Sequence, residues 1–233
     1  NKTLAEKAMD GKIVARLKGG DPFIFGRGGE EALYLAERGI EFEIIPGISA
    51  LASVPAYAGI PVTHRGASNE IHIYTGSSKE GGIPFDLKTA AQNSGTSVIF
   101  MGVSGIGEIT QGLIQNGKEK NTPTAVIENG TTSSQRVVSG TLENIEELCI
   151  IEGIKPPALI VIGNSVNLRD KIKWFSEDRR AIAGKKVAVT RDLKSCGSFA
   201  DSVYELGGKP IIFPLIKIVQ LKADIDVSKF NGV

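Results

Sequence analysis

The chain has 233 residues, enough for one large domain or for one domain and part of a second. Its 27 basic and 26 acidic side chains nearly cancel, which leaves no overall field to attract nucleic acid or an anionic membrane. No apolar run approaches the roughly 18 to 20 residues that cross a bilayer. Two distant cysteines fit no metal or redox spacing and favour a reducing, cytoplasmic setting. We therefore expect no nucleic-acid partner, no membrane partner and no metal.

Short β-rich segments alternate with helical ones over the first 164 residues. The pattern predicts strands at residues 13–17, 42–45, 71–75, 97–101, 124–128 and 158–162. It predicts helices at residues 30–38, 50–58, 87–92, 106–115 and 142–151. Gly39 is a predicted helix stop, and Ser49 is a predicted N-cap. This alternation is typical of an α/β fold with a mostly parallel sheet, to which residues 135–138 could add an antiparallel strand.

The pattern changes after residue 164. Residues 165–183 are polar and charged and predict a linker. A second α/β unit then begins at residue 184, with predicted strands at 186–190 and 210–214 around a helix at 198–206. Roughly 50 residues cannot bury a complete α/β core alone, so residues 184–233 are expected to be only the beginning of a domain.

Gly19-Gly20-Asp21-Pro22 follows the first predicted strand. Ligands of open α/β sheets bind at the carboxyl ends of strands, and glycines let a ligand approach the main chain. The Asp21 carboxylate could accept a hydrogen bond from a ribose hydroxyl or an amino group, although the same residues also suit a plain turn. Neither the dinucleotide-binding fingerprint nor a P-loop is present, so nucleotide triphosphate hydrolysis is not expected.

Two further turns carry chemistry. Pro46-Gly-Ile-Ser-Ala50 joins a predicted strand to a helix, and Pro61-Val-Thr-His-Arg-Gly66 lies beyond that helix. His64 and Arg65 are donors suited to carboxylates, although a lone histidine is at least as often structural.

Several long segments share one order along the chain: residues 18–31, 46–50, 60–66, 101–102, 123–131 with Gln135 following, and 157–163. Together they resemble the signatures of the uroporphyrinogen-III C-methyltransferases, a branch of the tetrapyrrole methylase superfamily. The resemblance covers about residues 1–170. It implies a domain at residues 1–164 with the two-lobed tetrapyrrole methylase fold, an α/β fold with mostly parallel or mixed sheets.

The resemblance also implies a cofactor, S-adenosyl-L-methionine, held in a cleft between two α/β lobes. Motif by motif, the residues expected to contact it are Gly19, Gly20, Asp21, Ile24, Ser49, Ala50, Met101 and Gly130. The family further implies a homodimer.

The implied reaction is C-methylation of uroporphyrinogen III to precorrin-2 through precorrin-1. An electron-rich pyrrole is itself the nucleophile, so positioning can supply much of the acceleration. The substrate is rich in carboxylates, and Arg27, His64 and Arg65 are the predicted substrate contacts. Lys18 and Arg136 are weaker candidates, and Arg136 is better explained as a solvated surface charge.

Members of this family begin with a strand and a Gly-Pro-Gly-x-x-Asp loop, neither of which precedes Asn1. The resemblance therefore implies a chain that lacks an N-terminal part, for which we name no general base and expect inactivity in isolation. Residues 184–191, 198–208 and 210–215 resemble the opening of uroporphyrinogen-III synthase, which implies a fusion of two activities.

Two alternatives remain open. The chain could be another tetrapyrrole methylase, acting on a later corrin intermediate or on an RNA or protein target, although residues 61–66 favour the uroporphyrinogen branch. It could instead be a non-catalytic cofactor-binding or assembly fragment. The sequence does not distinguish a sirohaem from a cobalamin pathway.

Overall fold

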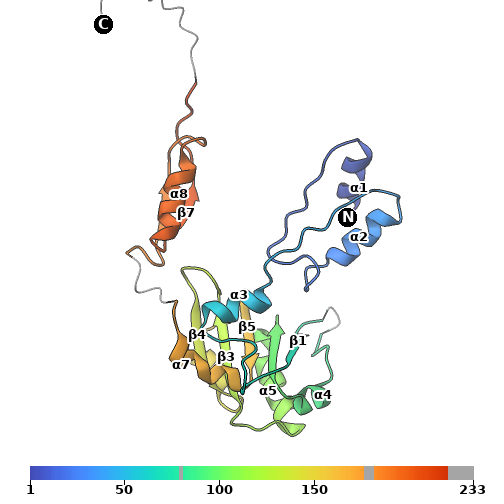
Figure 1. The fold of residues 1–233 in the computed structure, drawn as a ribbon, viewed down its shortest axis with the longest axis vertical. Coiled ribbons are helices and arrows are strands. Elements are labelled where there is room, and N and C mark those ends of the chain that lie inside the picture. Colours follow the sequence, from blue (N-terminus) through green and yellow to red (C-terminus); the bar gives the residue numbers. More distant parts are fainter. Residues whose placement is uncertain (79–80, 176–180, 220–233) are drawn as a thin grey trace, which may run out of the picture. The chain divides into compact units, whose positions relative to one another are not determined.

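A computed structural model describes residues 1–78, 81–175 and 181–219. The chain divides into two compact units, Asn1–Ser176 and Glu177–Val233, which are treated separately (Figure 1). The middle of the predicted linker, residues 176–180, and the end of the predicted second domain, residues 220–233, lie outside the described residues.

The first unit is built on a five-stranded sheet with the order β1-β2-β5-β3-β4. Its strands are β1 (Ile71–Thr75), β2 (Thr96–Phe100), β3 (Pro123–Glu128), β4 (Arg136–Thr141) and β5 (Ala158–Ile162). Only β1 and β2 pair in parallel, and the other three pairs are antiparallel. The sheet is therefore mixed, as the resemblance implies, and not mostly parallel as the alternation of elements alone suggests. The connection between β3 and β4 is too short for a helical crossover, so these strands form an antiparallel pair.

Alternating strand residues face opposite sides of the sheet and bury two separate cores. On one side Val98 and Val161 pack with α3 (Ala50–Tyr57). On the other, Ile99 and Ile160 pack with helices α4 (Leu87–Gln92), α5 (Ile106–Gln115) and α6 (Ile145–Ile151). The sheet and its covering helices can be followed in Figure 1. The first unit thus has three layers, with helices on both faces of the sheet.

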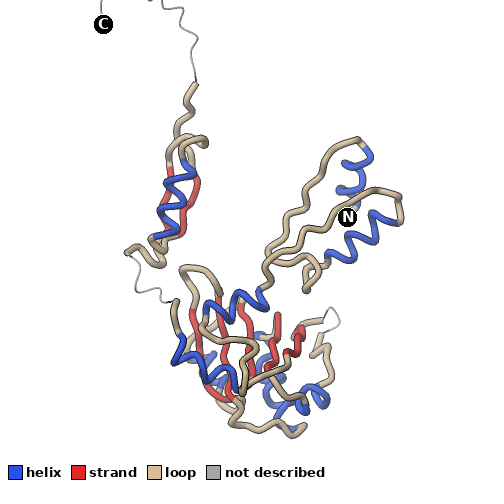
Figure 2. The backbone as a smooth tube through the Cα atoms, viewed as in Figure 1, coloured by secondary structure: helices blue, strands red, loops and turns tan. Residues whose placement is uncertain are grey.

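The segment before α3 contains α1 (Lys2–Met9) and α2 (Gly28–Ala36), and Figure 2 shows the stretches around α2 as loops. The predicted strands at residues 13–17 and 42–45 are wrong, because neither stretch is a strand. A strand needs a hydrogen-bonded neighbour, and no described strand pairs with either stretch. Their apolar side chains, such as those of Ile13 and Ile45, remain exposed.

The remaining predicted elements are present with small shifts of their ends. Gly39 has a positive φ of 65° just after α2, which confirms the predicted helix stop. Two short 3₁₀ segments, η1 (Val103–Gly105) and η2 (Asn164–Leu168), and the helix α7 (Arg169–Ile172) complete the first unit. Across the described ranges, every helix is too short or too polar to cross a membrane.

The second unit begins with a βαβ arrangement. Strands β6 (Lys186–Val189) and β7 (Lys209–Ile212) pair in parallel, with α8 (Cys196–Glu205) between them in sequence. Val203 of α8 and Val189 of β6 are buried. The predicted strand–helix–strand order of this segment is confirmed.

Three buried hydroxyl groups contact one another at the start of β2, and the central one belongs to Thr96, the first residue of that strand. Thr96 is fully buried, and its Oγ1 donates to Ser68 Oγ at 2.9 Å and lies 3.0 Å from Ser165 Oγ. Replacing the central hydroxyl with a methyl group leaves two buried hydroxyls with a lost partner. We expect Thr96→Val to lower the free energy of unfolding by about 1 to 3 kcal/mol, measured by urea denaturation. Thr141→Val, at a half-buried position of β4, is the control, and equal losses in the two variants would contradict the prediction.

Candidate cofactor cavity

An open cavity of about 1050 Å³ lies at one end of the strands of the sheet. Strands β1, β2 and β3 run in one direction and β5 runs in the other, so the last residues of the first three strands and the first residues of β5 lie at this same end. Gly76, Met101 and Asn129 directly follow the first three strands, Pro157 directly precedes β5, and all four line the cavity. The topology of the sheet therefore explains why distant segments of the chain build one site.

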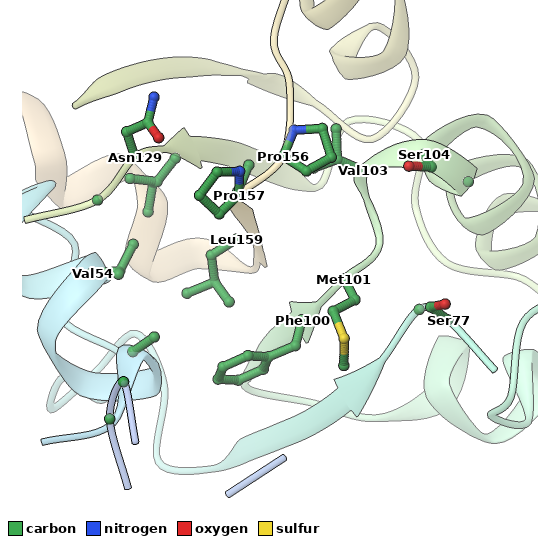
Figure 3. A pocket seen from close by; sticks show the side chains of 18 of the residues that line it. Val54, Ser77, Phe100, Met101, Val103, Ser104, Asn129, Pro156, Pro157 and Leu159 are labelled. Atoms are coloured by element: carbon green, nitrogen blue, oxygen red, sulfur yellow. The ribbon is translucent and has the colours of Figure 1, made fainter. Parts of the chain in front are cut away.

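Apolar side chains form facing walls in this cavity. Figure 3 shows Phe100 and Met101 on one side and Pro157 and Leu159 across from them, with Val54 contributed by α3. Serine and threonine hydroxyls are also part of the lining, from residues 53, 77, 78, 104, 131 and 132. Among the described lining residues, Glu108 has the only ionisable side chain. The cavity thus suits an organic ligand with apolar faces and several polar groups better than a highly charged anion.

Backbone segments approach very closely where glycines line or adjoin the cavity. A Cβ on Gly76 would lie 2.4 Å from the Cα of Gly102, and one on Gly47 would lie 2.5 Å from the carbonyl oxygen of Gly20. Neither position can accept a side chain unless the backbone moves. The first pair brings the ends of β1 and β2 together, and the second brings together the turns at residues 19–22 and 46–50.

Asp21 joins these same two turns. Its carboxylate accepts from the Phe23 amide at 2.8 Å and from the Gly47 amide at 3.1 Å, and these hydrogen bonds lower the pKa of the carboxyl group. Asp21 does not line the cavity. The Asp21 carboxylate, which was expected to accept from a ligand hydroxyl, therefore already accepts from two backbone amides, and these contacts hold the two turns together.

The start of α3 borders the cavity. Ser49 is the N-cap, and its hydroxyl accepts from the Leu51 amide at 3.2 Å, which confirms the predicted cap. Ala50 in the first turn of the helix lines the cavity. The preceding segment is anchored by Phe25, whose ring lies 5.0 Å from the ring of Phe100 between centroids.

The structure brings together five of the eight residues expected to contact a cofactor. Gly19, Gly20, Ala50, Met101 and Gly130 line the same cavity. The other three, Asp21, Ile24 and Ser49, are not part of the lining, although Asp21 and Ser49 directly adjoin the lining residues Gly20 and Ala50 in the chain.

The predicted substrate contacts Arg27, His64 and Arg65 are exposed and lie outside the cavity lining. Arg27 pairs with Glu30 at 2.7 Å. Lys18 pairs with Glu31 at 2.9 Å, and Lys18 together with Arg16 lowers the pKa of Glu31. Because none of the three predicted contacts lines the cavity, their roles as substrate contacts remain predictions.

Arg136 lies at the surface, as expected, with 46% of its side chain exposed, and it also forms an ion pair that the sequence did not indicate. Its Nε donates to Glu128 Oε2 at 2.6 Å, and its guanidinium also donates to the carbonyls of Glu152 and Gly153. Glu128 is buried and also accepts from the Lys155 amide at 2.8 Å. Arg136 and Glu128 thus hold the segment 152–155, which leads to Pro156 and Pro157 in the cavity lining. The hydrogen bond from Arg136 is also the main reason why the pKa of the Glu128 carboxyl group is lowered.

Three non-glycine residues of the lining have left-handed backbone conformations. Met101, Asn129 and Thr131 have φ values of 52°, 49° and 69°. Such conformations cost free energy and persist where the surroundings fix them, commonly at ligand sites. Their grouping around one cavity is independent support for a binding function.

Sequence reasoning missed several lining residues, among them Gly76, Ser77, Asn129 and the Pro156-Pro157 pair. Each lies at the end or just before the start of a correctly predicted strand. Their position relative to the strands was the available signal, but it depends on strand direction, which the sequence pattern did not give. Among the described residues, no three His, Cys, Asp or Glu side chains cluster as metal ligands would.

The three-layer fold and the cavity at the strand ends define the class of protein. The chain belongs to the tetrapyrrole (corrin/porphyrin) methylases, whose family model matches residues 1–146, more than half of its length. It is 49% identical over 174 residues to the S-adenosyl-L-methionine-dependent uroporphyrinogen III methyltransferase of Methanosarcina barkeri. That match covers 73% of this chain and 68% of the relative.

Two further similarities concern the structure and the second unit. The uroporphyrin-III C-methyltransferase of Thermus thermophilus, solved in complex with S-adenyl homocysteine, shares 36% identity and a TM-score of 0.62, over 72% of this chain and 73% of that one. The porphyrin biosynthesis protein HemD of Ruminiclostridium josui is 41% identical over 225 residues, 95% of this chain and 44% of that protein. The chain spans less than half the length of the first curated relatives that it matches.

Proposed function

We propose that the first unit binds S-adenosyl-L-methionine and methylates carbon atoms of uroporphyrinogen III, which yields precorrin-2 through precorrin-1. The observation that carries this proposal is the cavity at the strand ends, lined by five of the residues expected to contact the cofactor. The names of the Methanosarcina and Thermus relatives support the same substrate and cofactor class.

The residues of the cavity fit this cofactor. The facing apolar walls, with Phe100 on one side and Leu159 on the other, suit a flat aromatic base (Figure 3). The hydroxyls of the lining can bind a ribose and an amino-acid group. Glu108 offers a carboxylate to a ligand that carries positive charge. A volume of about 1050 Å³ leaves room for the cofactor in an extended or a folded conformation.

When bound, S-adenosyl-L-methionine supplies an electrophilic methyl group on a positively charged sulfur. The chain's own contribution is to hold the reacting groups in line, which can account for a large part of the barrier without an activated side-chain nucleophile. The close contact of the turns at Gly20 and Gly47 fixes one end of the cavity, and Arg27, His64 and Arg65 are the proposed counter-charges for substrate carboxylates.

Calorimetric titration with S-adenosylhomocysteine tests the proposal. We expect the wild-type chain to bind, and Asp21→Ala to weaken binding about tenfold or more because the two turns lose the carboxylate that joins them. Asp86→Ala is the matched control, because Asp86 also accepts from two backbone N–H groups but lies outside the cavity lining. Absence of binding by folded wild-type chain would contradict the proposed function. Unchanged affinity in Asp21→Ala would contradict only the role of Asp21.

We also propose that residues 184–233 begin a uroporphyrinogen-III synthase domain, so that the full protein makes the substrate that it methylates. The parallel βαβ arrangement and the match of the Ruminiclostridium protein across both units support this proposal. The full gene product should convert hydroxymethylbilane into uroporphyrinogen III, and a product of uroporphyrinogen I only would contradict it.

We further propose a cytoplasmic homodimer. The exposed apolar side chains of Ile13, Leu17, Ile45 and Ile48 support a subunit contact in the segment before α3, and the two free buried cysteines fit a reducing compartment. Light scattering during gel filtration tests the dimer, and a monomer at micromolar concentration would contradict it.

A further inference from the structure

Two further walls of the cavity touch each other. One is formed by Ala50 and Val54 of α3, and the other by residues 129–132. A Cβ on Gly130 would lie 2.5 Å from Cγ1 of Val54, so the two walls already touch at this glycine. The width of the cavity next to this contact therefore depends on how α3 and the segment 129–132 are held relative to each other.

Gln135 connects these two walls directly. Its Oε1 accepts from the Thr131 amide at 2.8 Å, and its Nε2 donates to the Tyr57 carbonyl at 3.2 Å. Gln135 is buried and does not itself line the cavity. A neutral amide has an acceptor and a donor at the end of one side chain, so it can join an N–H group of one segment to a C=O group of another.

The partner on α3 is one of the carbonyls left without an intrahelical donor at the end of the helix. Trp174 and Arg169 donate to the carbonyls on either side of Tyr57. Three side chains, one from residue 135 and two from the segment 169–174, therefore fix the end of α3. Of these three, the bond from Gln135 is the one that continues to a cavity-lining segment.

The partner in the other wall is a residue with an unfavourable backbone conformation. Thr131 has a φ of 69°, and such a conformation in a residue with a branched side chain must be held by its surroundings. The hydrogen bond from the Thr131 amide to Gln135 is a contact that holds it.

We propose that Gln135 is a positioning residue that sets the width of the cofactor cavity, by fixing the segment 129–132 against the end of α3. This inference rests on the proposed cofactor function of the cavity. Gln135 acts through Thr131 and Tyr57 and not by contact with the ligand, so its loss should change affinity for the cofactor without removing any group that binds it.

The experiment compares Gln135→Met with wild-type chain by calorimetric titration with S-adenosylhomocysteine. Methionine keeps the length and most of the volume of the side chain but can neither donate nor accept the two hydrogen bonds. We expect the Kd to rise about tenfold with the number of binding sites unchanged. Gln111→Met, at an exposed position of α5 outside the cavity lining, is the matched control and should bind as wild type does.

The folded fraction separates positioning from stability, because partial reversible unfolding raises the apparent Kd in proportion to the inverse of that fraction. Urea denaturation of Gln135→Met gives the folded fraction at the temperature of the titration, and a rise in Kd no larger than this fraction explains would overturn the inference. An unchanged Kd at full stoichiometry would overturn it as well, while the proposed function would stand. Absence of binding by the wild-type chain would instead contradict the proposed function and, with it, this inference.

Hydrogen exchange gives a second readout and serves also if Gln135→Met folds poorly. Gln135→Glu keeps an acceptor for the Thr131 amide, but an ionised carboxylate cannot donate to the Tyr57 carbonyl. Thr131 should stay protected in Gln135→Glu and lose protection in Gln135→Met, with the amides of β3 unchanged in both. Equal protection of Thr131 in the wild type and both variants would overturn the inference.

Discussion

Gly76→Ala should lower the affinity for S-adenosylhomocysteine at least tenfold and the free energy of unfolding by about 1 to 3 kcal/mol. The added methyl carbon would lie 2.4 Å from the Cα of Gly102 and 3.1 Å from its nitrogen. These are backbone atoms at the end of β2, so they cannot turn aside as a flexible side chain would. The substitution must therefore separate the ends of β1 and β2, where both segments form the cavity.

Gly29→Ala is the matched control for this prediction. Gly29 lies in the first turn of α2 and outside the cavity lining, and a Cβ added there meets no atom within 4 Å. Its substitution should leave affinity and stability close to wild type, as measured by calorimetric titration and urea denaturation. Equal behaviour of the two alanine variants would show that the close approach at Gly76 does not control the cavity.

Arg136→Met should lower the free energy of unfolding at pH 7 by about 2 to 3 kcal/mol, because a buried carboxylate loses its charged partner. Glu128 is 5% exposed, and among the described residues its carboxylate would keep only the hydrogen bond from the Lys155 amide after the substitution. The segment with the carbonyls of Glu152 and Gly153 would also lose its donors. Lys120→Met is the control, because its pair with Glu143 is exposed on both sides and should be worth at most about 1 kcal/mol.

The effect of Arg136→Met should depend on pH in a defined direction. Arg136 lowers the pKa of Glu128 in the folded protein, so the stabilisation is complete above the unfolded-state pKa of about 4.3 and is lost as pH falls through the folded-state pKa. The stability difference between wild type and variant should thus be constant from neutral pH down to about pH 5 and shrink below about pH 4. A difference that grows on acidification would contradict the assigned ion pair.

Strands with a strong local signal could be predicted from the sequence. The apolar runs of β2, β3 and β5 are buried on both faces, and turn residues mark their ends, so their positions needed little tertiary information. The direction of β5 was not predictable in this way, because strand direction depends on the neighbouring strands and not on the apolar run itself.

The errors have one physical cause, which is that local pattern does not specify partners. Residues 13–17 have an apolar run but no described neighbouring strand, so no ladder forms. The long-range partners of Asp21 and Arg136, at Gly47 and at residues 152–153, could not be predicted from the local pattern for the same reason. Gly19, Gly20, Met101 and Gly130 were placed in the site through the family resemblance, and for Met101 and Gly130 the structure gives a reason, because they follow the ends of β2 and β3.

The strands form the sheet, whereas the segments that connect them supply much of the cavity lining. These segments follow β1, β2 and β3 and precede β5, and the last or first residues of the strands, such as Phe100 and Leu159, supply the rest of this side of the cavity. Insertions or substitutions in those segments can therefore alter which ligand is accepted while the strand pairing stays intact. A scaffold of this kind can thus accommodate a different ligand through changes in its connecting segments, while the strand order of the sheet is kept.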